Sequence, residues 1–174
     1  MSGPSIEELF ALFPGPDAQF PYALVPGDEV PAPYHDLLVH EHHMTVTVEA
    51  YHGGPVDVRV LAWRLDGTHY ARKILLVHQA TGKVVQFGIV RIDLSKTSPE
   101  VSAAIVARDT PVGRILIRHD VLRRIEPTAF VRIDAGPEQM AWFGETGPGV
   151  LYGRLAIIHF DGKPAVELLE VVCR

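Results

Sequence analysis

The chain has 174 residues, of which 47% are hydrophobic and 21% charged, as in an ordinary single globular domain. The formal net charge of −5 argues against nucleic acid as a partner, and the single cysteine, Cys173, excludes an internal disulfide framework or a thiolate metal cage. No stretch of about 18 apolar residues could form a membrane-spanning helix, and the start of the chain lacks the basic character of a signal peptide. We therefore expect a cytoplasmic protein that binds neither nucleic acid nor a membrane.

The beginning of the chain differs in composition from the rest. Ser5 and Glu8 fit a helix capping box, and apolar residues follow them at helical spacing. Pro14-Gly-Pro16 ends this helix, and proline and glycine recur in the extended segment that follows. We expect residues 1–33 to form an N-terminal helix and a Pro/Gly-rich leader, and residues 34–174 to form a single domain.

Two short elements are expected between residues 34 and 51. Asp36 could cap a short helix that carries Leu37 and Leu38. The segment 45–51 has the composition of a strand, although Thr45 could also N-cap a helical turn. Both alternatives stay open at this point.

The remainder of the chain indicates strands that are joined mostly by tight turns, with two helices in the middle. The expected strands cover residues 56–65, 70–78, 84–94, 121–125, 129–133, 151–160 and 165–172. Ser98-Pro99-Glu100 predicts one helix start, and Asp109-Thr-Pro-Val-Gly113 repeats the cap-plus-proline signal for a second helix through residue 117. The segment 136–149 is expected to be a loop. Six or seven strands in this arrangement predict an α+β fold, with an antiparallel sheet and helices covering one face.

Arg72 lies on an apolar face of the strand expected at residues 70–78. With a period of two, its neighbours on that face are Ile74, Leu76 and His78. An arginine is seldom placed among aliphatic side chains unless an anionic group pairs with it. We therefore interpret Arg72 as a cationic group that is held on a sheet to receive a carboxylate.

Histidines crowd one short segment, at His35, His40, His42 and His43. His40 and His43 could share a helical face, but the spacing matches no known zinc motif. The alternative is a set of exposed polar histidines. We favour that alternative and expect no metal.

Two glutamates, Glu167 and Glu170, occur in an otherwise aliphatic last strand. They lie on opposite faces, so a regular strand buries at most one of them. A carboxylic acid in an apolar setting has a raised pKa and can donate a proton or a hydrogen bond near neutral pH. The alternative is a glutamate at a sheet edge, or a buried ion pair with an arginine such as Arg154.

Several motifs occur in an order that resembles a known family. Over roughly residues 35 to 172 they are Met44-Thr45, Tyr70-x-Arg72-x-Ile-Leu-Leu76, the turn at Gly82, Asp109-Thr-Pro-Val-Gly-Arg114, Tyr152-Gly-Arg154, Asp161-Gly-Lys-Pro164 and Leu168-Leu-Glu170. With them the sequence resembles the chorismate pyruvate-lyase family, whose fold is a six-stranded antiparallel sheet with helices on one side and an enclosed site. The same fold appears in ligand-sensing domains of transcription regulators. The resemblance also selects the helical alternative for residues 45–51.

The resemblance implies roles for individual residues. Arg72 matches the family's arginine that grips the ring carboxylate of the substrate. Glu170 matches the glutamate near the end of the last strand, and Glu167 stays as an alternative because family members differ by one residue in this spacing. Val112 matches a residue whose backbone N–H reaches the ligand, and Met44 matches a residue that lines the pocket.

By this resemblance the protein is expected to be a carbon–oxygen lyase. It would eliminate pyruvate from chorismate to give a hydroxybenzoate, most simply 4-hydroxybenzoate, with Arg72 and Glu170 as catalytic residues and Arg154 as further positive charge. The reaction needs no cofactor and no metal, and the protein would be a monomer or a homodimer. The alternative is a non-catalytic protein of the same fold that binds a small aromatic acid. Because both Arg72 and Glu170 are present, we expect the enzyme.

Overall fold

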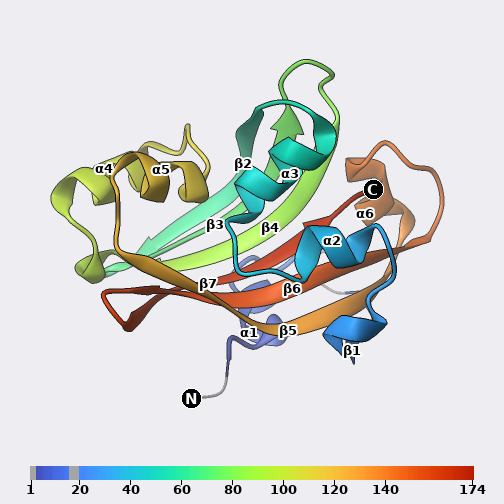
Figure 1. The fold of residues 1–174 in the computed structure, drawn as a ribbon, viewed down its shortest axis with the longest axis horizontal. Helices are drawn as coiled ribbons and strands as arrows, with labels where there is room; N and C mark the ends of the chain where they lie inside the picture. Colours follow the sequence, from blue (N-terminus) through green and yellow to red (C-terminus); the bar gives the residue numbers. More distant parts are fainter. Residues whose placement is uncertain (1–2, 16–19) are drawn as a thin grey trace.

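The computed structural model describes residues 3–15 and 20–174 and contains one antiparallel sheet with helices on both faces (Figure 1). The first helix, α1, spans Ile6–Ala11, and the Ser5 side chain accepts a hydrogen bond from the backbone N–H of Glu8. This helix and its serine cap are confirmed. The Pro16 that was expected to end it lies outside the described residues, as do the next three positions of the leader.

The sheet has seven strands in the order β1-β5-β6-β7-β4-β3-β2, and all neighbouring pairs are antiparallel. The strands are β1 Tyr22–Val25, β2 Val56–Asp66, β3 His69–His78, β4 Val84–Asp93, β5 Arg123–Ala135, β6 Gly149–Phe160 and β7 Lys163–Val172. The predicted α+β class with an antiparallel sheet is confirmed. Strand β1 falls in the segment that was expected to be a leader, where it pairs with β5 at the edge of the sheet.

Strands β2, β3 and β4 form the predicted meander. Their turns contain Gly67 and Gly82, whose φ angles of +59° and +69° are accessible to glycine at little cost. The alternation within β3 separates two sets of side chains. Ala71 and Leu75 belong to a core with α1, whereas Ile74 packs on the opposite face of the sheet.

Two segments differ from the prediction. The strands expected at residues 121–125 and 129–133 are one continuous strand, β5, with a bulge between Pro127 and Ala129. The bulge lets the strand continue past a proline that has no N–H to give to the ladder. The loop expected at 136–149 contains helix α6, Pro137–Trp142, because Pro137 occupies a first-turn position and Gln139 accepts a hydrogen bond from the N–H of Gly136.

The other helices are α2 Tyr34–Leu38, α3 Met44–His52, α4 Pro99–Ala107 and α5 Val112–Arg118, with short 3₁₀ turns η1 Gly27–Glu29 and η2 Leu94–Lys96. The helical alternative for residues 45–51 is therefore confirmed, but the predicted caps at Asp36, Thr45 and Asp109 are wrong. These residues lie inside α2, inside α3 and before α5, and the N-cap positions belong to Pro33, His43 and Pro111.

Helices α2 to α5 cover one face of the sheet, and α1 and α6 pack against the other (Figure 1). On the α1 side, Phe10 and Phe87 are buried in one apolar cluster, with Trp142 stacked on Phe87. On the other side the apolar layer is divided between α4 with α5 and α2 with α3. In the described part of the chain, no helix has the length and apolar character needed to cross a membrane.

The start of helix α4 gives a first testable prediction. Ser98 is its N-cap, and the Ser98 hydroxyl accepts a hydrogen bond of 3.2 Å from the N–H of Val101. Ser98→Ala should lower the free energy of unfolding by about 1 kcal/mol, because it leaves this donor without a protein partner. Urea denaturation measures the change. Ser95→Ala, in the neighbouring 3₁₀ turn, is the control and should cost less.

Candidate functional site

A cavity lies between the sheet and the first turns of α3 and α5. Its floor comes from β2, β3, β4, β6 and β7, and its roof from residues 43–45 and 111–113. Figure 1 shows these two helices side by side over the same face of the sheet. The cavity has a volume of about 60 Å³, enough for several water molecules. Its walls are largely aliphatic, with a few polar side chains among them, as is usual for ligand sites.

Arg72 stands in the cavity wall on β3 and is 1% exposed. Its Nη2 donates a hydrogen bond of 2.9 Å to the carbonyl oxygen of Thr110, just before α5. Its Nε and Nη1 are buried and have no hydrogen-bond partner among residues 3–15 and 20–174. Burial lowers the pKa of the Arg72 guanidinium, with Tyr70 and Asp109 opposing that change, and an arginine stays charged at neutral pH. The wall thus holds a cation whose Nε and Nη1 make no hydrogen bond within the described residues, with the Tyr70 hydroxyl as a close neighbour.

Glu170 on β7 also lines the cavity, and it is paired with Arg154 on β6. The Nε of Arg154 donates to Oε2 of Glu170 at 2.7 Å, and both side chains are buried. Burial raises the pKa of Glu170, whereas Arg154 lowers it. The carboxyl group is held in one orientation beside the cavity and can serve as a hydrogen-bonding group there.

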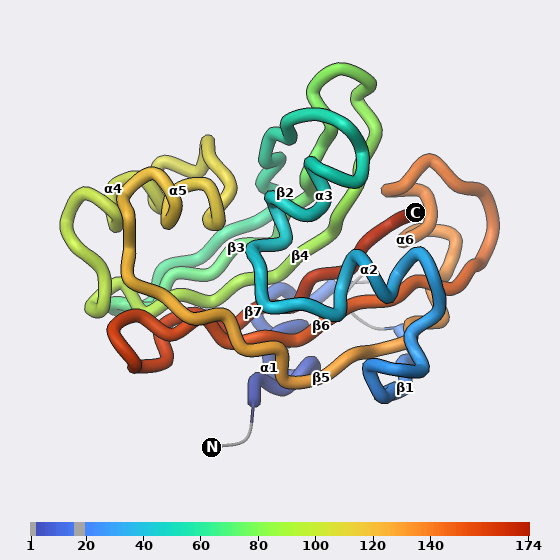
Figure 2. The backbone as a smooth tube through the Cα atoms, viewed as in Figure 1, coloured from blue at the N-terminus to red at the C-terminus, as the bar shows by residue number. Residues whose placement is uncertain are grey.

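Arg154 itself is not part of the cavity wall. Its Nη1 donates to the carbonyl oxygen of His40 at 2.8 Å, and its Nη2 donates to that of His42 at 3.1 Å. Figure 2 shows the backbone between α2 and α3, which carries these carbonyls, crossing the face of the sheet. Arg154 therefore fixes this segment, and with it the start of α3, instead of supplying charge directly to a ligand.

The structure brings four of the sequence-predicted residues to one cavity: Arg72, Glu170, Met44 and Val112 all line it. The alternative carboxylate, Glu167, does not line it. It lies on the other face of β7, where its Oε2 accepts a hydrogen bond of 2.6 Å from Nε of Arg91. The side-chain alternation of β7 thus places Glu170, and not Glu167, at the cavity.

Three polar wall residues were not predicted as site residues from the sequence: His43, Thr45 and Gln86. All three are buried. The buried Oε1 of Gln86 has no hydrogen-bond partner in the described part of the chain. Gln86 shares its face of β4 with Gly88 and Val90. An amide on this apolar face of a strand could therefore have indicated a site residue from the sequence. His43 and Thr45 gave none, because their place depends on the contact between two helices.

Neutral His43 gives a prediction of pH dependence. Burial, and then Arg123 and Arg154, lower the pKa of His43 from 6.5 to about 4. The unfolded chain therefore binds more protons than the folded chain between these values, and stability falls as the pH drops through that window. From pH 7 to pH 5 this residue should cost about 1–2 kcal/mol, after discounting for its partial contact with solvent. Urea denaturation at both pH values should show this loss in the native sequence and a smaller one in His43→Phe.

Helices α3 and α5 meet closely above the cavity. A side chain at Gly113 would place its Cβ 3.0 Å from the Thr45 hydroxyl and 3.3 Å from the ring of His43. Arg114 and Glu49 form an ion pair between the same two helices. Glycine at 113 therefore permits the approach that closes the roof.

Gly113→Val tests the importance of this approach. We expect the substitution to push α5 away from α3 and to weaken any binding in the cavity by about tenfold, since misplaced groups lose their contacts. Gly82→Val is not a suitable control, because its φ is positive. Ala104→Val on α4 is suitable, and it should change affinity by less than twofold.

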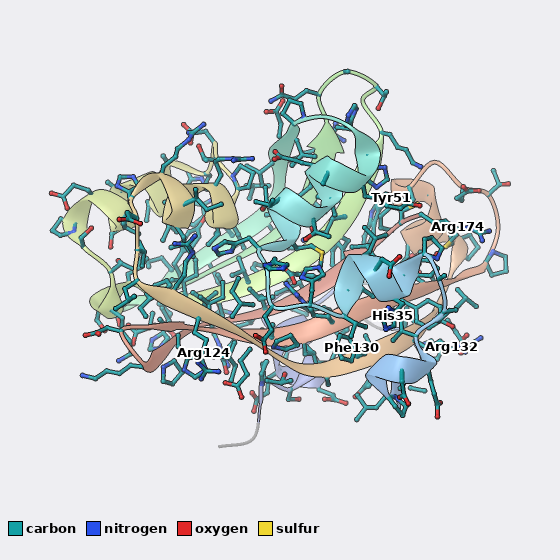
Figure 3. The ribbon with its side chains drawn as sticks, viewed as in Figure 1. His35, Tyr51, Arg124, Phe130, Arg132 and Arg174 are labelled. Carbon is teal, nitrogen blue, oxygen red and sulfur yellow. The ribbon has the colours of Figure 1, made fainter. Side chains whose placement is uncertain are left out.

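The four histidines of the cluster lie in different surroundings. Among the residues that the structure describes, no group of three or more His, Cys, Asp or Glu side chains is placed to hold a metal ion. His35 lies on the outside of α2 beside Asp36 (Figure 3), and His40 and His42 stack on each other. Only His43 turns out to belong to the cavity wall.

Neither a protein-family model nor a curated protein matches the sequence. Solved structures match this chain in fold, among them the following three. PhnF from Mycobacterium smegmatis has a TM-score of 0.54 at 11% identity, over 78% of this chain and 65% of PhnF. The gene product SA0254 from Staphylococcus aureus has a TM-score of 0.51 at 11% identity, over 69% of this chain and 84% of SA0254. The possible transcriptional regulator YydK from Bacillus subtilis has a TM-score of 0.50 at 10% identity, over 68% of this chain and 58% of YydK.

The chain shares their fold. At this identity the likeness extends to the architecture alone, and the chain spans less than two thirds of PhnF and of YydK. The part of the predicted resemblance that concerns the fold is confirmed by these matches.

The expectation of a carbon–oxygen lyase is wrong. None of these three proteins is described as an enzyme, and YydK is described as a possible transcriptional regulator. The physical reason is that a fold fixes where side chains lie and not which chemistry they perform, so the matching motifs of the sequence predicted the scaffold better than the reaction. The expected exclusion of nucleic acid as a partner also loses its support, because YydK, which shares the fold, is described as a possible transcriptional regulator.

Proposed function

We propose that the protein binds a small carboxylate, with an aromatic acid as the best-fitting class, and that it does not transform this ligand. The observation that carries the proposal is Arg72, a buried guanidinium in a cavity wall with Nε and Nη1 unpaired. Leaving two such donors unsatisfied is costly, because they have lost water without gaining a partner. A carboxylate in the cavity removes that cost and neutralises the charge.

The geometry of the unused donors supports a carboxylate. Nε and Nη1 each share one two-pronged edge of the guanidinium with Nη2, and a carboxylate can accept both hydrogen bonds of such an edge at once. Nη2 has two N–H groups, so the one that does not bond to Thr110 can complete an edge. The third nitrogen, Nη2, is already fixed by Thr110. Arg72 is thereby held in one orientation before a ligand arrives, which reduces the entropy lost on binding.

The remaining lining supports a flat, mostly apolar body. Aliphatic side chains such as Ile74, Val90 and Leu168 form much of the wall, and the polar groups of Gln86 and Glu170 add hydrogen-bonding capacity. A monocyclic acid with a ring substituent, such as a hydroxybenzoate, matches this combination. As YydK is described as a possible transcriptional regulator, we propose that ligand binding in this chain serves to sense the ligand.

A thermal-shift experiment with paired ligands tests this function. Benzoate, 4-hydroxybenzoate and chorismate are compared with benzamide and 4-hydroxybenzamide, which have the same ring but no charge. At about 100 times the Kd, a ligand stabilises the fold by about 2.7 kcal/mol. For a chain of this size that raises Tm by roughly 5–10 °C.

The expected result is a rise with at least one acid and none with its amide. Equal shifts for acid and amide, or no shift at all, would contradict the proposed carboxylate site. Release of pyruvate from chorismate in the same samples would contradict the proposal that the ligand is left unchanged.

A further inference from the structure

His43 is held by an arginine that does not itself line the cavity. The Nε of Arg123 on β5 donates to Nε2 of His43 at 2.5 Å, and Nη1 of Arg123 donates to the carbonyl oxygen of Val121 at 2.9 Å. An arginine cannot accept a hydrogen bond, so Nε2 of His43 must be the unprotonated ring nitrogen. The proton of the neutral imidazole therefore resides on Nδ1.

His43 lines the cavity, and its Nδ1–H is an unused donor. This N–H has no hydrogen-bond partner among the residues that the structure describes. The Nδ1 atom is also not among the unpaired atoms that are completely buried, so it keeps some accessible surface. The arginine on the opposite ring nitrogen withdraws electron density from the imidazole and makes Nδ1–H a stronger donor. His43 thus presents a positively polarised N–H without carrying a formal charge.

The start of helix α3 adds donors at the same place. His43 is the N-cap of this nine-residue helix and makes no side-chain cap hydrogen bond. The first backbone N–H bonded within the turn is that of Thr47, which leaves the N–H groups of Met44 and Thr45 without helical partners. Together with the positive end of the helix dipole, these groups favour an oxyanion. A separate observation also indicates that this cavity binds an anionic ligand: the guanidinium of Arg72, in the same cavity wall, is buried and has unpaired nitrogens.

Positive charges outnumber negative charges around the cavity. Arg72 lines it, Arg154 and Arg123 contact its wall residues, and Glu170 is the one acid in the described wall. Asp109 lies near Arg72 but is exposed, so water screens its charge. A ligand with one carboxylate would offset Arg72 and leave the His43 wall without an anion.

We propose that His43, positioned by Arg123, is a specificity-determining residue that binds a second oxyanion, so that the protein selects small ligands with two anionic groups over ligands with one. The inference rests on the proposed function, because it assigns the first carboxylate to Arg72. Arg123 is a positioning residue: it acts on the ligand through the tautomer and orientation of His43.

Calorimetric titration with matched pairs of ligands tests this selection. Benzoate is compared with the three benzenedicarboxylates, and butanoate with butanedioate, in the full chain at pH 7 and constant ionic strength. We expect at least one dicarboxylate to bind tenfold or more tightly than its monocarboxylate. If the monocarboxylates bind and no dicarboxylate binds more tightly, the inference is overturned and the proposed function stands. If none of these ligands binds, both fail.

Two variants and a neighbouring control locate the effect. His43→Phe keeps a ring but removes the donor, and Arg123→Met removes the arginine behind it. Each should reduce the preference for the dicarboxylate to about twofold or less. Arg124→Met, at the exposed neighbouring position of β5 (Figure 3), should keep the full preference. An unchanged preference in both His43→Phe and Arg123→Met overturns the inference.

A spectroscopic measurement separates positioning from a general loss of structure. Nitrogen NMR of the His43 ring should show one tautomer, protonated at Nδ1, in the native sequence and in Arg124→Met. In Arg123→Met the two tautomers should mix, since nothing then fixes Nε2 as the acceptor. A single Nδ1–H tautomer that persists in Arg123→Met would show that the arginine does not position the ring.

Discussion

Arg154→Met should lower the free energy of unfolding by about 3–5 kcal/mol, the largest loss of stability expected for any single substitution proposed for this chain. The substitution removes the partner of Glu170 and leaves a buried carboxylate without a cation. It also frees the carbonyl groups of His40 and His42, which Arg154 holds against the sheet. Urea denaturation at pH 7 measures the change.

Two controls distinguish this role from that of an ordinary ion pair. Arg132→Met breaks the exposed pair between Arg132 and Asp134 on β5 (Figure 3) and should cost less than 1 kcal/mol. The double variant Arg154→Met/Glu170→Leu should recover part of the loss, because no buried charge is then left alone. If Arg154→Met were no more harmful than Arg132→Met, Arg154 would not hold the start of α3.

Arg72→Leu should have the opposite character: it should abolish ligand binding and leave the fold intact. Hydrogen bonds to charged groups contribute about 1.5–3 kcal/mol each, so the loss of two should weaken carboxylate binding by about 100-fold or more. The fold should be equally stable or more stable, because a desolvated cation with two unpaired donors is replaced by an aliphatic side chain. Calorimetric titration with the best acid and urea denaturation measure the two effects.

The control for Arg72 is Arg91, on the neighbouring strand β4. Arg91 is paired with Glu167 outside the cavity, and Arg91→Met should leave the affinity for the acid unchanged. Equal affinity in Arg72→Leu and the native sequence would remove the basis of the proposed function. A marked loss of stability in Arg72→Leu would instead indicate that Arg72 has a structural role through Thr110.

Much of the sheet was predictable from the sequence because its strands have a regular alternation and its turns contain glycine. Gly67 and Gly82 marked the meander, and Ser98 with Pro99 marked helix α4. The single strand β5 was not predictable, since Pro127 reads as an interruption unless the bulge is known. The caps of α3 and α5 were also missed, because tertiary packing sets where these helices begin.

The site was predictable where it depends on strands. Arg72 could be found from its place on an apolar face, and the period of two separates Glu170 from Glu167. The contribution of His43 could not be found in this way. It depends on the meeting of α3 with α5 and on Arg123, 80 positions later in the chain. The function assigned from sequence failed for another reason, namely that one scaffold can serve catalysis or binding.

A crystal structure of the protein with 4-hydroxybenzoate, or with the best-binding acid of the panel, tests whether Arg72 receives the carboxylate. We predict electron density for the acid inside the cavity, with one carboxylate oxygen about 2.7–2.9 Å from Nε or Nη1 of Arg72 and the other at a similar distance from Nη2. The contact between Nη2 and Thr110 should be retained. An acid bound elsewhere on the protein, or bound in the cavity with its carboxylate away from Arg72, would show that Arg72 is not the carboxylate-binding group.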